Sequence, residues 1–119
     1  MSQPHTTPEE EKLVDACIFL PMAIKTLERD LKVLENSNLK IPEVYEEIIH
    51  QMILRMREDL KESKKTMLQQ KMKVWHIGQE NEMTIYGSVI RGYEAQHKFW
   101  SHRLRSRTKE ILLDYSRIK

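Results

Sequence analysis

The sequence has few of the residues that build disulfides, turns or membrane spans. Its 119 residues include one cysteine, three glycines and four prolines. The single cysteine, Cys17, excludes an internal disulfide and cannot build a thiolate metal site by itself. No apolar run approaches the roughly 18 residues of a membrane span. Residues 1–11 also lack the basic region and apolar stretch of a secretory signal, so we expect a cytoplasmic protein.

Charged and apolar side chains, by contrast, are abundant. Charged residues make up 32% and hydrophobic residues 39% of the chain, and the mean hydropathy is −0.63. A chain of this length forms one small domain, and so densely charged a surface is more typical of helices than of sheets. We expect a mobile tail at residues 1–6 and a single helical domain at residues 7–119.

Two long helices are predicted in the first part of the chain. The first begins at Thr7-Pro8-Glu9-Glu10, where an N-cap hydroxyl, a proline at the first helical position and a glutamate that reaches back form a capping box. It runs to about residue 36. Pro21 predicts a kink within it, because the proline ring clashes with the preceding turn. The second helix is expected from Pro42 to about Lys71, with an amphipathic pattern of its own.

The remainder of the chain is predicted less uniformly. In residues 73–87, two β-rich stretches straddle Gly78, so a short β-hairpin competes with an irregular link. From Ile90 to Ile118, apolar residues recur at helical spacing and predict a third helix. Short connections favour antiparallel neighbours. We therefore predict an all-α fold, an elongated antiparallel three-helix bundle.

The sequence contains no convincing catalytic or metal-binding motif. Glu-x-x-His occurs at residues 47–50 and 94–97, and paired copies hold two metals in some helical bundles. Glu47 and His50 face away from the apolar seam of their helix, however, so no metal is expected. His97 is expected to be a hydrogen-bonded core or boundary histidine. Because nucleophile motifs and phosphate-binding glycine loops are missing as well, we expect neither an enzyme nor a cofactor.

Basic residues are concentrated near the end of the chain. Residues 83–119 carry eight Lys and Arg against three Asp and Glu, a net charge of +5. Five basic side chains fall on one face of the predicted third helix. Such a face binds nucleic-acid phosphates or an acidic protein surface, or it is simply solvated. No aromatic residue lies within it for base stacking. These residues are Arg91, Lys98, His102, Arg105 and Lys109.

A second candidate surface is apolar and lies where the predicted bundle ends. Its side chains either cap the core or stay exposed for a protein groove or a second copy of the chain. They are Met67, Met72, Trp75 and Ile77. The favoured function is thus a small non-enzymatic interaction or regulatory protein that self-associates or binds a protein partner, with no role at membranes. The alternative is a nucleic-acid-binding accessory protein that uses the basic face.

Overall fold

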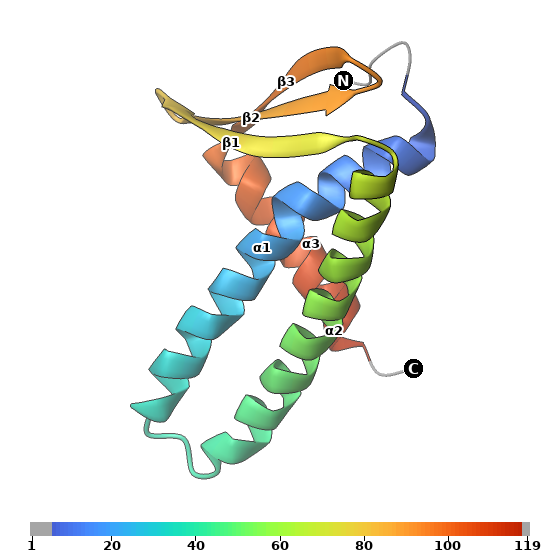
Figure 1. Ribbon diagram of the computed structural model, residues 1–119. Coiled ribbons are helices and arrows are strands. Elements are labelled where there is room, and N and C mark those ends of the chain that lie inside the picture. Colours follow the sequence, from blue (N-terminus) through green and yellow to red (C-terminus); the bar gives the residue numbers. More distant parts are fainter. Residues whose placement is uncertain (1–5, 118–119) are drawn as a thin grey trace.

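The computed structural model describes residues 6–117 and combines three helices with a three-stranded antiparallel sheet (Figure 1). The prediction of an all-α three-helix bundle is therefore wrong, because the fold is α+β. The predicted tail lies outside the described residues except for Thr6. The elements are α1 (Pro8–Glu35), α2 (Pro42–Gln69), β1 (Lys73–Glu80), β2 (Met83–Ile90), β3 (Tyr93–Trp100) and α3 (Ser101–Ser116).

The start of α1 follows from its capping box. The backbone N–H of Glu10 donates to the Thr7 hydroxyl at 3.1 Å, and the backbone N–H of Thr7 donates to the Glu10 carboxylate at 2.9 Å. Pro8 stands at the first helical position, where its missing N–H costs nothing. The helix continues through Pro21, and Figure 1 shows its axis changing direction part-way along.

The core lies where α1, α2, α3 and the sheet meet. In the half of α1 near the sheet, the buried side chains include Val14, Ile18, Phe19 and Leu20. This part of the helix is buried on several sides because an element packs on each of them. Toward the loop that joins α1 to α2, only the seam between the two helices is covered. Met56 of α2, with no exposed surface, lies on that seam.

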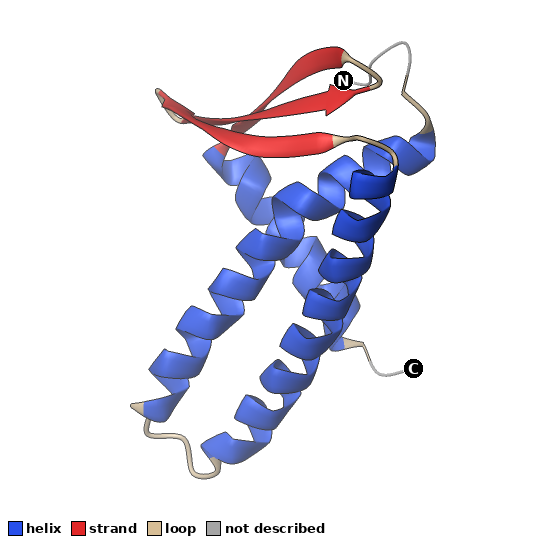
Figure 2. Cartoon of the chain, in the orientation of Figure 1, coloured by secondary structure: helices blue, strands red, loops and turns tan. Residues whose placement is uncertain are grey.

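The sheet lies across one end of the helical hairpin formed by α1 and α2 (Figure 2). Its strands follow chain order, and β2 pairs with both neighbours. The hairpin left open by the sequence at residues 73–87 falls within β1 and β2. The helix predicted from Ile90 onward is wrong up to Trp100, since residues 93–100 pair with β2 as a third strand. Only Ser101–Ser116 is helical in this part of the chain.

The last helix, α3, crosses the hairpin and is tied to both of its arms. Arg107 of α3 forms an ion pair with Asp15 of α1 at 2.8 Å. The hydroxyl of Tyr115 donates to Asp59 of α2, and Arg55 of α2 donates to the Tyr115 carbonyl. Across residues 6–117, every helix is too short or too polar to traverse a lipid bilayer.

Candidate functional site

The two faces of the sheet have different environments. In an antiparallel pair, residues that are register partners point to the same side. Tyr86 and Phe99 belong to the face that packs on the helices, because Phe99 meets Phe19 of α1 edge-on, with ring centroids 5.4 Å apart. Tyr86 packs on Phe99 with centroids 6.3 Å apart. Residues that alternate with these along each strand form the outer face of the sheet.

Both tryptophans of the chain belong to this outer face. Trp75 of β1 is the register partner of Gly87, and Trp100 of β3 is the register partner of Met83. The Trp75 indole lies directly over Gly87, whose hydrogen leaves the space that a larger side chain would fill. Trp75 remains 43% exposed and Trp100 49% exposed. The outer face therefore presents two large aromatic side chains to solvent.

Beneath these tryptophans the outer face has a small apolar layer of its own. Ile85 of β2 is only 7% exposed, yet it lies outside the core cluster that joins the sheet to the helices. Val89 follows it on the same face and is partly buried. Polar residues of β3 line the neighbouring row, with Gln96 beside Gly87 and Lys98 beside Ile85. An apolar centre bordered by polar side chains is the usual composition of a protein interface.

The structure divides the predicted apolar patch between the core and the surface. Met67 and Met72 are each 5% exposed and belong to the core. Trp75 and Ile77 are exposed, and Ile77 stands at the bulge where the β1 register shifts. Of the two alternatives stated above, the two methionines cap the core. Trp75 and Ile77 remain as candidate interface residues.

The predicted basic face is also divided, because the first part of the predicted third helix is the strand β3 in the structure. Arg91 stands in the β2–β3 turn and forms an ion pair with Glu10 of α1. The hydrogen bond from Arg91, together with that from the Thr7 backbone, holds the pKa of Glu10 below its ordinary value. Lys98 belongs to the outer face of the sheet. Of the predicted set, only His102, Arg105 and Lys109 share one side of α3.

His97 is a hydrogen-bonded boundary residue on the inner face of the sheet. Its Nε2 atom lies 2.8 Å from the hydroxyl of Ser88, which is 1% exposed. Partial burial lowers the pKa of His97 and favours its neutral form. Among residues 6–117, no three His, Cys, Asp or Glu side chains converge on a position that could hold a metal ion. The Ser88–His97 contact joins β2 and β3 on the inner face of the sheet.

Cys17 is partly buried at the junction of α1 and α2. Its thiol lies 3.0 Å from the sulfur of Met67, and burial raises its pKa. A thiol with a raised pKa has little thiolate at neutral pH and is a weak nucleophile. The sulfur thus behaves as part of the apolar packing.

Comparison with known proteins assigns the chain to a family. A family model described as YhjD protein matches residues 5–119. The chain belongs to the YhjD family. The uncharacterized protein YhjD of Bacillus subtilis (strain 168) is 32% identical over 112 residues, which cover 94% of this chain and 93% of that protein. No solved structure matches this YhjD-family chain.

The residue that sequence reasoning missed in this YhjD-family chain is Trp100. In the predicted third helix, Trp100 follows His97 at i+3 and would share its face, whereas the strand turns the two side chains to opposite faces of the sheet. Residues 93–100 did carry a signal, because Tyr93, Ala95 and Phe99 occupy alternate positions and the charged or amide side chains Glu94, Gln96 and Lys98 occupy the positions between. Arg91 and Gly92, both with positive φ, form the tight turn that makes this strand antiparallel to β2.

Proposed function

We propose that this chain is a non-enzymatic interaction protein that binds a protein partner through the outer face of its sheet. The observation that carries the proposal is the position of Trp75 and Trp100, which lie half exposed on one face. Figure 1 shows all three helices on the other side of the sheet. In the described part of the chain, no helix or strand covers these side chains. Tryptophan is enriched at the energetic centres of protein interfaces, where a partner excludes water from it.

The charge on this face favours a protein partner. Lys73 and Lys98 are offset by Glu80 and Glu94, which belong to the same face by register. A face with equal numbers of acids and bases gives little attraction to a phosphate backbone. It is well suited to the polar rim of a protein interface, where opposite charges set orientation more than affinity.

Single-stranded nucleic acid is the second candidate, and one observation favours it. The predicted basic face held no aromatic residue, but the strand β3 places Lys98 and Trp100 on the same face of the sheet. Bases stack on exposed aromatic rings while lysines contact the phosphates. The two carboxylates on this face oppose such binding, and for this reason we rank it second.

The first experiment identifies a partner and maps its site. Partners captured by the full chain are compared among the wild type, Trp100→Lys and Ile77→Lys. Leu54→Lys is the matched control, because Leu54 is 58% exposed on α2, away from the sheet. We expect the wild type and Leu54→Lys to retain a partner that both outer-face variants lose, with unchanged circular dichroism. Equal retention by all four proteins would rule out this face.

Intrinsic fluorescence then tests the contact directly. The chain has two tryptophans, and both lie on the proposed surface, so their emission reports its occupancy. Titration with the purified partner should shift the emission with little dependence on salt. Titration with a short oligothymidylate should leave it unchanged. Strong quenching by the oligonucleotide that weakens steeply with salt would instead support nucleic-acid binding.

A further inference from the structure

The helical hairpin carries a second exposed apolar surface, away from the sheet. Val44 and Ile48 lie at i and i+4 on one side of α2, and Ile41, the N-cap residue of the helix, precedes Val44 by three positions. Each is about half exposed. Val33, near the end of α1, is 63% exposed. Single exposed hydrophobic residues are ordinary, but a continuous row on one helix face indicates a contact surface.

This surface lies open because α3 covers only part of the hairpin. The last turn of α3 is held against Arg55 and Asp59 of α2, and Ile48 lies about two turns further toward the loop. Figure 1 shows both arms of the hairpin extending well beyond α3. No element of residues 6–117 packs on that part.

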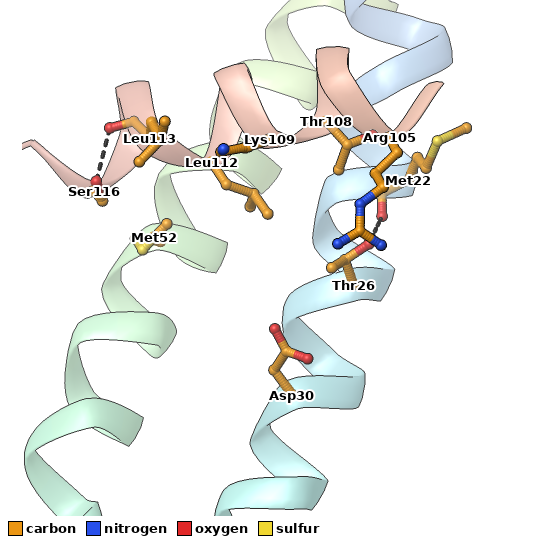
Figure 3. Close-up of a pocket in the computed structure, with 10 residues that line it drawn as sticks. All are labelled: Met22, Thr26, Asp30, Met52, Arg105, Thr108, Lys109, Leu112, Leu113 and Ser116. Atoms are coloured by element: carbon orange, nitrogen blue, oxygen red, sulfur yellow. Dashed lines mark hydrogen bonds between the residues drawn. The ribbon is translucent and has the colours of Figure 1, made fainter. Parts of the chain in front are cut away.

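Where α3 crosses the hairpin, it leaves a cleft of about 670 Å³. Figure 3 shows Leu112 directed toward the space between the two arms and Arg105 lying beside Thr26 of α1. Met52 on the floor of the cleft is one turn from Ile48, so the cleft and the apolar row are continuous. We call the combined surface the open hairpin face; its apolar residues are Val33, Ile41, Val44, Ile48, Leu112 and Leu113.

The two ends of the open hairpin face carry opposite charge. At the cleft end, Arg105 and Lys109 are exposed and form no ion pair within residues 6–117. Asp30 also lines the cleft, on the α1 side. At the loop end, Glu47 of α2 is exposed and adjoins Val44, from which it lies at i+3. Glu47 is in no ion pair within the same range.

We propose that a second copy of this chain docks on the open hairpin face in an antiparallel, two-fold arrangement. The symmetry brings the loop end of each copy against the cleft end of the other, so that Glu47 meets Arg105 and Lys109 twice. The apolar rows then meet at the centre, and the free halves of two hairpins complete a four-helix bundle. In such an isologous interface both copies use the same surface, so each contact between two residues occurs twice.

The exposed area agrees with what a stable dimer requires. If each of the five exposed apolar side chains, which exclude the partly buried Leu112, presents on the order of 100 Å², one copy contributes about 500 Å² of apolar surface. Bordering polar side chains bring the total close to the roughly 800 Å² per partner of a standard interface. This surface is separate from the outer face of the sheet, so a dimer leaves Trp75 and Trp100 accessible.

Light scattering on the full chain, across a range of concentrations, tests the proposal. We expect the mass of two copies for the wild type and for Leu54→Lys, whose substituted side chain lies on another side of α2. Val44→Lys and Ile48→Lys should have the mass of one copy at concentrations where the wild type is paired. Their circular dichroism should not change, because both side chains are already half exposed. A monomeric wild type, or paired Val44→Lys and Ile48→Lys variants, would overturn the proposal.

Charge reversal tests the antiparallel orientation. Changing Arg105 and Lys109 to glutamate should weaken association at least tenfold at low salt, and changing Glu47 to lysine should weaken it as well. The variant that combines all three changes should regain part of the lost affinity, because the lysine introduced at position 47 then meets the two introduced glutamates. Failure of the combined variant to recover, after each change alone has weakened association, would refute the orientation.

Discussion

Replacing Gly87 with alanine should disturb the outer face of the sheet from beneath. A Cβ atom at this position would stand 2.6 Å from two carbon atoms of the Trp75 indole. Non-bonded carbons pack at about 3.5–4.0 Å, so the ring has to move by roughly 1 Å. The backbone at Gly87 needs no left-handed conformation, so the whole effect arises from this contact.

The size of the effect follows from the exposure of the indole. Overpacking a closed core costs about 1–3 kcal/mol. Because Trp75 is 43% exposed, its ring can tilt toward solvent, and we expect the free energy of unfolding to fall by about 1 kcal/mol, at the low end of this range. Urea unfolding monitored by circular dichroism measures the loss. A red shift of tryptophan emission should accompany it, since the ring leaves the sheet.

A double-mutant cycle separates this contact from a general weakness of alanine in β2. In a Trp75→Ala background the clash is absent, so Gly87→Ala should be neutral or slightly stabilising, because alanine loses less chain entropy than glycine. A loss of the same size in both backgrounds would refute the reasoning. It would show that the indole does not occupy the space above Gly87.

Three further changes probe the buried polar groups. Thr108→Val should raise the free energy of unfolding by about 1 kcal/mol, because the Thr108 hydroxyl is buried without a partner in the described structure; urea unfolding that shows no gain would contradict this. Since Arg91 lowers the pKa of Glu10 below 4.5, their pairing should stabilise the fold above that pH and fade as pH falls through the folded-state value. Arg91→Gln should weaken this acid dependence in stability measurements down to low pH. The pKa of His97 lies below 6.5 in the fold, so the unfolded chain takes up this proton first and stability should decline as pH falls below about 6.5. His97→Gln should flatten that decline, and an unchanged pH profile would count against it.

Helices whose ends are set by local chemistry could be predicted from the sequence. The start of α1 depends on Thr7, Pro8 and Glu10, which lie within four residues of one another. The start of α2 depends in the same way on Pro42, whose fixed φ suits the first helical turn. Such signals need no information about the rest of the chain. They located both long helices correctly.

The third strand could not be decided locally. Ile90, Tyr93 and His97 fit the spacing of one helix face, but they also lie on the inner face of the sheet once β2 and β3 pair. Pairing with β2 satisfies the backbone groups of residues 93–100 that point toward that strand, whereas an isolated helix there has little to pack against. Whether residues 93–100 form a strand or a helix therefore depends on β2, which is separated from them in the sequence by a turn. This is why the helical prediction failed up to Trp100 and succeeded beyond it.

The candidate surfaces could be predicted only in part, for a similar reason. The sequence marks Met72 and Trp75 as apolar, but the fold decides that the first is covered and the second exposed. Arg105 and Lys109 stayed together because α3 is helical there, while Lys98 and Trp100 came together through a strand. Residue type is local information. Which side chains share a surface depends on how the elements are arranged.

The lengths of the helices explain why this chain retains uncovered apolar surface. Each arm of the hairpin has 28 residues and α3 has 16, which correspond to about 42 Å and about 24 Å at 1.5 Å per residue. Even aligned with the hairpin, α3 would leave more than a third of its length open, and because α3 crosses it obliquely it covers less still. The sequence nevertheless places Val44 and Ile48 on that open part, facing the side that α3 occupies nearer the sheet. In the proposed dimer a second hairpin covers this row, whereas a monomer would leave it in water.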